Sequence, residues 1–224
     1  MISVIVPTFN EEKTIVESIM RLKQMRGTCE IIVVDGGSTD KTVERAEPHA
    51  KVIRSDKGRA NQMNAGAKAS MGDVLWFVHS DSRVDEESLN HIQSACLSGV
   101  DAGCFSLSFY DYDASFMKAL AFTSNLRAKY LKLMFGDQGI FVRKAVFDRL
   151  NGFKTIPIME DWDLSKRLYA CCSVRILSSK IGTSGRRFEE GGALRTLLKM
   201  HWIKWKYVRG MPPEELIEYY REIR

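Results

Sequence analysis

The run Ile31–Val34 constrains the fold more than any other part of this 224-residue chain. Its four consecutive β-branched residues predict a strand that is buried on both faces, as in a parallel sheet covered by helices. Asp35 ends the run and Gly36 follows it, so a carboxylate and a flexible backbone stand at the carboxyl end of the strand. Open α/β sheets bind their ligands at that edge. An ordinary strand–turn–helix corner is the alternative interpretation of this segment taken alone.

Composition sets the broad class of the protein. Hydrophobic residues make up 45% of the chain and charged residues 27%, as in ordinary globular proteins. The 33 basic and 28 acidic residues leave a net charge of +5. This mild excess suits an anionic ligand or membrane surface, and no concentrated basic face indicates nucleic-acid binding. The five cysteines show no C-x-x-C spacing, which argues against a disulfide framework and a zinc site. We therefore expect reduced cysteines and a cytoplasmic protein.

Strand and helix signals alternate along the first half of the chain. Strands are expected at residues 2–6, 31–34, 51–54 and 74–78, and helices at 12–25, from 41 onward and at 59–70. This βαβαβ order predicts an α/β fold with a mainly parallel sheet and right-handed crossovers. The second half is less regular, with strands expected at 102–110, 139–142 and 174–177 and helices at 116–135, 143–150, 161–171 and 193–209.

We expect one domain over residues 1–224, because no repeat, low-complexity tract or linker interrupts the chain. Within it we distinguish a first half (1–100), a second half (101–190) and a helical tail (191–224). The chain opens directly on a strand signal, and no apolar run reaches the roughly 18 residues of a membrane span. Neither a signal peptide nor a transmembrane segment is therefore expected.

Polar residues follow the first expected strand and open the third expected helix. Pro7 ends the sheet ladder, Asn10 can cap the next helix, and Glu11 suits a helix start. Arg59 belongs to a basic loop that enters a helix of small residues carrying Asn64. Such a loop can hold a diphosphate through its charge and the helix-terminal amides. Simple capping and a solvated basic loop are equally good interpretations of these two segments.

The segment His79-Ser80-Asp81 follows the fourth expected strand directly, so Asp81 is expected at the same sheet edge as Asp35. A carboxylate near a phosphate suits Mg²⁺ or Mn²⁺, which take oxygen ligands and share them with substrate phosphates. A turn without a ligand is the alternative.

Two adjacent acids, Glu160 and Asp161, open a later helix, and a polar turn with Asp137 and Gln138 precedes them in the sequence. Acids at this position can simply cap the helix. They can also have two different catalytic roles, in which one acid takes a proton and the other orients the first acid or holds the substrate.

Taken together, these blocks resemble glycosyltransferases of family 2, which have the GT-A fold. The matching segments are Val4–Glu11, Val33–Asp40, His79–Asp81 and Glu160–Asp161. The likeness is greatest to a bacterial subgroup whose further blocks match residues 58–66, 136–139 and 159–161. The resemblance covers roughly residues 2–190, and the order and spacing of the blocks are more specific than any one of them.

The resemblance implies a nucleotide-diphosphate sugar donor and inverting transfer to an acceptor hydroxyl whose identity the sequence leaves open. By position, the nucleotide-sugar site comprises Pro7, Asn10, Glu11, Asp35, Gly36, Arg59, Asn64, His79, Ser80 and Asp81. Asp81 is the expected ligand of Mg²⁺ or Mn²⁺ and Asp161 the expected base, with Glu160 beside it and Asp137 and Gln138 on the acceptor side. The chain departs from the family pattern at His79, where the Asp-x-Asp motif has its first acid. A neutral imidazole can bond a ribose hydroxyl but adds no charge to a metal shell.

Two rival functions remain at this point. A sugar nucleotidyltransferase would carry a glycine- and arginine-rich loop after the first strand, where this chain has Pro7–Glu11. A non-catalytic nucleotide-sugar binding protein is the second, which His79 allows and the intact Glu160–Asp161 pair argues against.

The tail places Trp202 and Trp205 among basic residues. A basic helix with aromatic side chains can lie on an anionic bilayer, and peripheral membrane contact would suit a lipid-linked acceptor. We favour the simpler interpretation, in which this helix covers the sheet or contacts a second copy in a homodimer.

Overall fold

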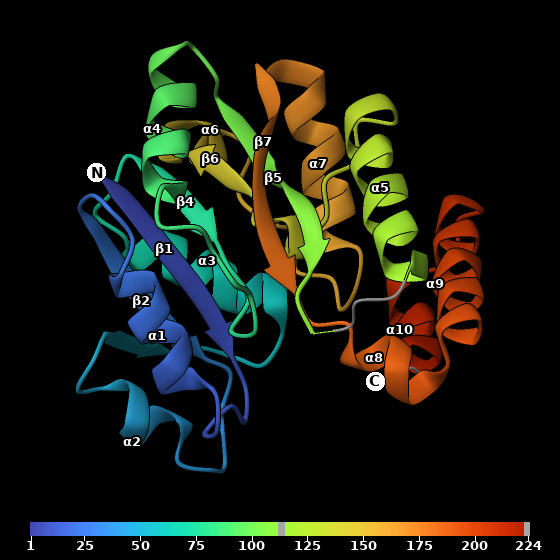
Figure 1. Ribbon diagram of the computed structural model, residues 1–224, viewed down its shortest axis with the longest axis horizontal. Helices are drawn as coiled ribbons and strands as arrows, with labels where there is room; N and C mark the ends of the chain where they lie inside the picture. The colour runs from blue at the N-terminus through green and yellow to red at the C-terminus, as the bar shows by residue number, and fades with distance from the viewer. Residues whose placement is uncertain (112–114, 222–224) are drawn as a thin grey trace.

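A computed structural model describes residues 1–111 and 115–221, and one mixed sheet organises them (Figure 1). The described strands are β1 (Ile2–Thr8), β2 (Cys29–Asp35), β3 (Lys51–Arg54), β4 (Val74–Phe77), β5 (Ala102–Phe109), β6 (Phe141–Arg143) and β7 (Val174–Thr183). They pair in the order β3-β2-β1-β4-β6-β5-β7. Among them β6 alone is antiparallel to its neighbours, β4 and β5, while the other pairings are parallel. The predicted α/β fold with a mainly parallel sheet is therefore confirmed.

Helices cover both faces of this sheet (Figure 1). They are α1 (Ile15–Lys23), α2 (Thr42–Ala46), α3 (Arg59–Ala69), α4 (Ser88–Leu97), α5 (Ser115–Tyr130), α6 (Lys144–Arg149), α7 (Glu160–Cys171), α8 (Arg186–Gly191), α9 (Ala193–Val208) and α10 (Pro213–Arg221). Alternate residues of β1 enter different cores: Ile5 packs with residues of α3, α6 and α7, and Val4 with residues of α1 and α4. The burial of Ile32, Val33 and Val34 at 0% exposure confirms a strand covered on both faces.

The structure corrects two local predictions for the first turn. Pro7 does not end β1, because it pairs with Val34 in the parallel ladder. Since β4 pairs with β1 only as far as Ile5, β1 lacks a partner on that side at Pro7 and tolerates the missing N–H. Asn10 does not cap the next helix, because its φ is +55° and its amide oxygen accepts a hydrogen bond from the Thr39 N–H at 2.9 Å.

Several element boundaries also differ from the sequence-based expectation. The helix expected at 12–25 begins at Ile15, and the one expected at 116–135 ends at Tyr130, two residues before Lys132 adopts a left-handed φ of +55°. Strand β7 continues from the expected 174–177 to Thr183 by pairing with β5 past a register shift. Helices α4, α8 and α10 were not predicted, because their periodicity is short or mixed.

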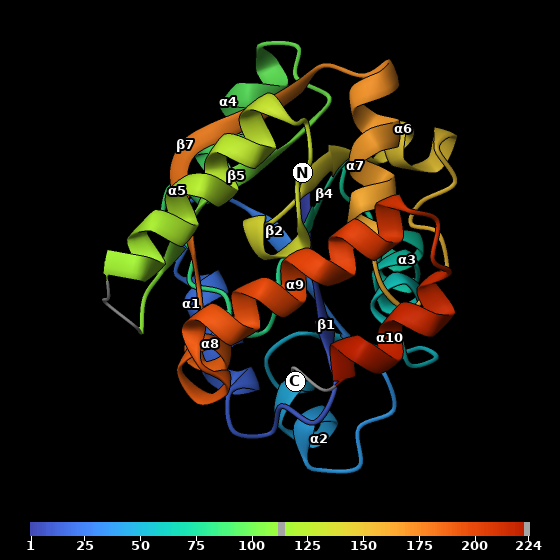
Figure 2. The same cartoon turned by 90° about the vertical axis from the view of Figure 1, so that its right-hand side faces the viewer.

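The C-terminal helices fold back over the start of α7 (Figure 2). Ile203 of α9 and Leu216 of α10 form a small core with Met159, the residue before α7. The tail helices α9 and α10 therefore pack against the segment at the start of α7 through their buried side chains. No helix in the described ranges is long and apolar enough to cross a membrane.

Candidate active site

The turn after β2 is held rigidly at the carboxyl edge of the sheet. Asp35 is 2% exposed and accepts hydrogen bonds from the N–H groups of Gly37 and Ser38, at 3.0 Å each. The side-chain amide of Gln62, on α3, donates to the carbonyl oxygens of Thr8 and Val34 at 2.8 and 2.9 Å. This amide ties α3 to the ends of β1 and β2. The Asp35 carboxylate is therefore fixed in place before any ligand arrives.

The loops after β1 and β2 are joined to each other. The Asn10 N–H donates to Ser38 Oγ at 2.9 Å, and the Glu11 N–H donates to Thr42 Oγ1 at 2.7 Å. An open hollow of about 430 Å³ lies beside this junction, lined by Asp35, Gly37, Ser38, Asp40, Lys41, Val43, Glu44, Glu47 and Arg54. Asn10, Glu11 and Asp35 are thus brought together, as expected from the sequence. Gly36 is buried beneath them, and its N–H bonds to the Thr8 carbonyl.

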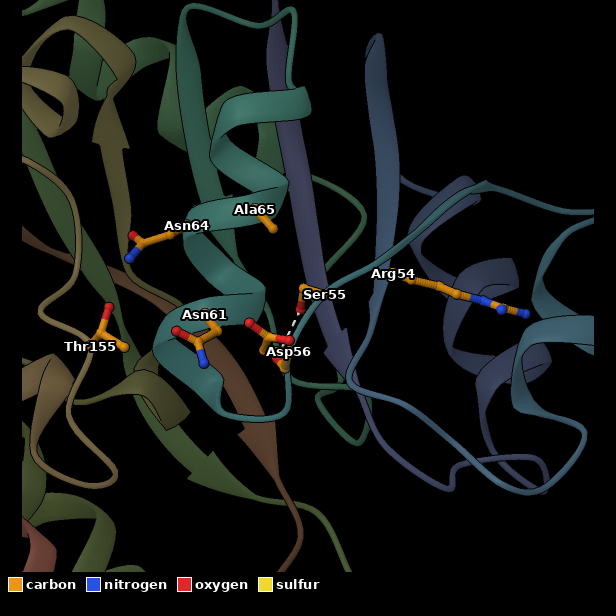
Figure 3. A pocket seen from close by; sticks show the side chains of 7 residues that line it. All are labelled: Arg54, Ser55, Asp56, Asn61, Asn64, Ala65 and Thr155. Carbon is orange, nitrogen blue, oxygen red and sulfur yellow. Dashed lines mark hydrogen bonds between the residues drawn. The ribbon is translucent and has the colours of Figure 1, made fainter.

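A second hollow, of about 580 Å³, lies between the start of α3 and the segment after α6 (Figure 3). Its lining residues are Arg54, Ser55, Asp56, Asn61, Asn64, Ala65 and Thr155, and Arg54 points away from the others. Asn64 uses its amide to bridge the N–H and C=O of Phe153, at 2.9 and 2.8 Å. Asn64 therefore fastens α3 to the Phe153 segment, and we do not include it in the proposed nucleotide site.

Arg59 lies where the separate acidic segments of the sequence converge. It opens α3 directly after Gly58, whose φ of +132° is one that L-residues rarely adopt. Burial opposes the charge on Arg59, but the Tyr220 hydroxyl and the carboxylates of Glu160, Asp161 and Asp81 together raise its pKa. Acids from the loop after β4 and from the start of α7 therefore lie within electrostatic reach of one guanidinium.

The start of α7 positions the two adjacent acids. Met159, immediately before the helix, has a φ of +69° in the left-handed region that bulky residues rarely adopt. Asp161 accepts a hydrogen bond at Oδ2 from the Gly136 N–H at 2.9 Å, so the turn before β6 orients its carboxylate. Glu160 is only 5% exposed. Burial, reinforced by the charge of Asp161 and opposed by Arg59, raises the pKa of Glu160 from 4.5 to about 7.

The Glu160→Gln variant should have a different pH dependence of stability from wild type. Since the folded-state pKa of Glu160 lies above its ordinary value, the folded protein binds the extra proton between about pH 4.5 and pH 7. The contribution of Glu160 to stability is therefore present below that window and lost as the pH rises through about 7. We expect the free energy of unfolding of the variant, relative to wild type, to increase across the window by on the order of 3 kcal/mol.

Urea unfolding at several pH values across this window measures the effect. The exposed Glu44→Gln variant on α2 is the control and should track wild type at every pH. Parallel curves for Glu160→Gln and wild type would contradict the raised pKa.

His79 lies close to the turn that holds Asp161. A methyl group added at Gly136 would lie 3.0 Å from His79 Nε2 and 3.7 Å from Asp161 Oδ2, so the imidazole and the expected base border the same small space. Asp81 is exposed, and its backbone carbonyl accepts a hydrogen bond from the Tyr110 hydroxyl at 3.0 Å. Ser80, between them, is 8% exposed.

The donor set around Asp81 fits a metal ion that arrives with a diphosphate. Within residues 1–111 and 115–221, no three His, Cys, Asp or Glu side chains gather closely enough to hold an ion by themselves. Asp81 supplies one accessible carboxylate, and Arg59 lies within its electrostatic reach. Mg²⁺ commonly uses one or two protein carboxylates together with substrate phosphates and water. The residues present therefore fit a shared metal rather than an all-protein cage.

Two cations that were not predicted at the site are Arg127 on α5 and Lys204 on α9. Both lie over the ring of Phe135, at 3.7 and 4.8 Å from its centroid. Burial and the charge of Arg127 lower the pKa of Lys204 to about 8, although Asp137 and Asp161 act in the opposite direction. Neither residue belongs to a motif in the sequence. Lys204 lies on a helix remote in sequence from the acids that affect it, and Arg127 lies near the end of the helix that precedes the turn of Asp137.

The two residues predicted on the acceptor side have different environments. Burial raises the pKa of the Asp137 carboxyl, and its Oδ1 is inaccessible and has no hydrogen-bond partner among the described residues. Gln138 is fully buried, and its amide bonds with Arg127 at 2.8 Å and with backbone groups of Phe135 and Phe105. Gln138 thus braces the turn η1 (Gly136–Gln138), and we retain only Asp137 near the proposed acceptor.

This arrangement defines a site at the carboxyl edge of the sheet, with an open hollow of about 430 Å³ and three acids within electrostatic reach of one arginine. The model of glycosyl transferase family 2 matches residues 3–150. The chain therefore belongs to glycosyl transferase family 2, as the sequence blocks indicated.

Curated relatives support the same family. Glycosyltransferase GlyG of Streptococcus pneumoniae is 32% identical over 124 residues, which cover 51% of this chain and 41% of that protein. A PGL/p-HBAD biosynthesis glycosyltransferase of Mycobacterium tuberculosis is 26% identical over 186 residues, covering 76% of this chain and 70% of that protein. An uncharacterized glycosyltransferase of Mycobacterium tuberculosis is 38% identical over 89 residues, and the match spans only 34% of its length.

Solved structures confirm the GT-A fold. A mannosyltransferase from Pyrobaculum calidifontis, in complex with GDP-Man and Mn²⁺, superposes with a TM-score of 0.68 at 18% identity, covering 99% of this chain and 69% of that one. TarS residues 1–349 of S. aureus, in complex with UDP, gives a TM-score of 0.63 at 22% identity, covering 79% and 57%.

Proposed function

We propose that this protein is an inverting glycosyltransferase that moves a sugar from a nucleotide-diphosphate donor to an acceptor hydroxyl. The observation that carries the proposal is the placement of Glu160 and Asp161 in the first turn of α7, where the Gly136 N–H holds the Asp161 carboxylate at 2.9 Å. These two acids and Asp81 also lie within electrostatic reach of Arg59. Family membership supports the reaction class. The structural neighbours in complex with UDP or with GDP-Man and Mn²⁺ support a nucleotide-sugar donor and a divalent ion.

The donor would occupy the sheet edge between Asp35 and Arg59. The nucleoside would lie near Pro7, Asn10, Glu11 and Asp35, and the diphosphate near Arg59 and Asp81. A Mg²⁺ or Mn²⁺ ion held by Asp81 would supply positive charge to the departing diphosphate. Arg59 supplies a fixed cation for the same charge, because its pKa is raised and it stays protonated. His79 would contact a ribose hydroxyl or the diphosphate without adding negative charge.

Asp161 is the proposed general base. The Gly136 N–H and the helix start hold its carboxylate at the site. The acceptor oxygen would attack the anomeric carbon on the face opposite the diphosphate, so that the new C–O bond forms as the sugar–phosphate bond breaks. The hydroxyl proton would pass to Asp161, and the electron pair would leave with the nucleoside diphosphate. Glu160, partly protonated near neutral pH, would then limit the charge beside the base.

The rival functions predict different outcomes. A binding protein would take up the nucleotide sugar without turnover, and a sugar nucleotidyltransferase would need a sugar phosphate and release pyrophosphate. We also propose a cytoplasmic site of action, since the described cysteines are all free thiols, as is usual in reducing compartments.

Nucleoside diphosphates should stabilise the protein in a thermal-shift assay, and Mn²⁺ should strengthen the effect. At 100 times its dissociation constant a ligand adds about 2.7 kcal/mol of stability, which is a clear shift in Tm. The Asp81→Asn variant should keep the response to the best nucleotide but lose the additional shift with Mn²⁺. The exposed Asp148→Asn variant on α6 is the control and should behave like wild type.

The outcome separates the elements of the proposal. If the Tm shift of wild type with nucleotide does not depend on Mn²⁺, the proposed donor site is supported and the proposed metal site at Asp81 is contradicted. Absence of a shift with every nucleotide would overturn the proposed function, while leaving the fold assignment intact.

A further inference from the structure

One face of α9 is apolar and exposed along its whole length. Leu194 and Leu198 are 64% and 61% exposed, and Val208 is 67% exposed. Trp202 and Trp205 lie between them along the helix, at 39% and 50%. These five residues recur at helical spacing and form a single stripe. We call this stripe the outer face of α9. The opposite side of the helix carries Ile203, which is buried against α7 and α10.

Basic groups border this outer face. Lys206 Nζ lies 5.2 Å from the ring centroid of Trp202, and Arg209 Cζ lies 4.8 Å from that of Trp205. Arg195, in the first turn of α9, is exposed. The helix, described throughout its length, contains no Asp or Glu. Acids of the tail occur instead on the flanking helices α8 and α10.

The neighbouring helix α5 has the same character. It lies on the same side of the molecule as α9 in both views (Figures 1 and 2). Phe122 and Tyr130 are exposed at 63% and 66%, and Lys118 and Lys129 are exposed on the same helix. Like α9, α5 is described throughout and contains no Asp or Glu. Two adjacent helices thus expose aromatic and aliphatic groups together with positive charge only.

We propose that the outer face of α9, extended by α5, docks on an anionic lipid bilayer. Apolar side chains with Trp among them enter the interface between headgroups and acyl chains, and basic side chains around them pair with anionic headgroups. The charge pattern favours this occupant over a second copy of the chain, because two such faces would bring like charges together. Lys204 of α9 lies over Phe135 at the proposed acceptor side, so docking would hold that side near the membrane.

Flotation with vesicles tests the proposal. Wild type should float with vesicles that contain phosphatidylglycerol and much less with vesicles of phosphatidylcholine alone. Binding should weaken in salt, because the Debye length falls from about 10 Å at 0.1 M to about 3 Å at 1 M. The Leu194→Ser/Leu198→Ser variant should lose at least about tenfold in vesicle affinity, since it removes two side chains that would enter the interface.

Matched variants complete the experiment. The Lys206→Gln/Arg209→Gln variant should bind anionic vesicles more weakly than wild type, and its vesicle affinity should depend less on the salt concentration. The Met71→Ser/Leu97→Ser variant removes apolar side chains that are 73% and 89% exposed outside α5 and α9, and it should bind like wild type. All of these sites are on the surface, so the variants should retain the Tm of wild type. Vesicle binding tests the docking proposal and turnover tests the proposed function. Because the two are measured separately, failure of one proposal can be distinguished from failure of the other.

Two outcomes would overturn the proposal. The first is equal recovery with neutral and anionic vesicles, or no flotation at all. The second is a wild-type dimer in light scattering that the Leu194→Ser/Leu198→Ser variant dissociates, without vesicle binding by either protein. That result would identify the outer face of α9 as a contact between copies of the chain.

Discussion

The Asp161→Asn variant is expected to lose sugar transfer by about 10²- to 10⁴-fold while it still binds nucleoside diphosphate. An amide keeps the shape of the side chain and can keep the contact with the Gly136 N–H through its oxygen, but it cannot take the proton of the acceptor hydroxyl. The loss should therefore appear in kcat, and the thermal shift with nucleotide should persist. Product formation from radiolabelled donor sugars measures the first quantity.

The control for this variant is Asp148→Asn, an exposed acid on α6 that should retain full activity. The Glu160→Gln variant offers a second comparison and should be less impaired than Asp161→Asn, because the Glu160 carboxyl is already partly protonated near neutral pH. Turnover of Asp161→Asn within a few fold of wild type would show that another group removes the proton.

The Arg59→Met variant is expected to weaken nucleoside diphosphate binding and to lower transfer by about 10²- to 10³-fold. Methionine keeps much of the apolar stem but removes the cation that faces Asp81, Glu160 and Asp161. Without it the three carboxylates repel one another and an incoming diphosphate. The same variant should raise the pKa of Glu160 further, since Arg59 is the group that lowers it.

Isothermal titration with the best nucleoside diphosphate and turnover assays measure these two losses. Arg59→Lys should have a higher affinity than Arg59→Met but a lower one than wild type. Lysine restores the positive charge but lacks the paired donors of the planar guanidinium. The control Arg26→Met removes an arginine that is 70% exposed and pairs with Glu86 and Glu87. Affinity and turnover unchanged in Arg59→Met would contradict a diphosphate site at the start of α3.

Local sequence rules were sufficient where a residue acts within its own segment. The β-branched run before Asp35 predicted a strand buried on both faces, because period and composition alone indicate how a strand is covered. The turn after this strand could also be predicted locally. Asp35 accepts hydrogen bonds from the N–H groups of Gly37 and Ser38, which are only two and three residues ahead of it. Asn10 shows the limit of such rules, because its partner is 29 residues away on another loop.

Long-range contacts account for the predictions that the structure changed. Asn64 and Gln138 have side chains that suit a polar site, yet Asn64 bonds to the Phe153 backbone and Gln138 to Arg127. Neither partner belongs to one of the sequence blocks, so these two bonds could be identified only in the folded protein. Lys204 went unnoticed for the same reason, because its relation to Asp137 exists only after α9 has folded over the turn before β6.

The α/β class, the succession of the main strands along the chain, the family, and the acids and the arginine of the proposed site could all be predicted from the sequence. Those features depend on composition, periodicity and short motifs, which act over a few residues. The folded chain was needed to show that Asp81, Glu160 and Asp161 lie within electrostatic reach of Arg59, and that α9 buries Ile203 while its opposite face is exposed. Charge interactions and burial depend on distance in space, and folding brings together residues that are more than a hundred positions apart in the sequence.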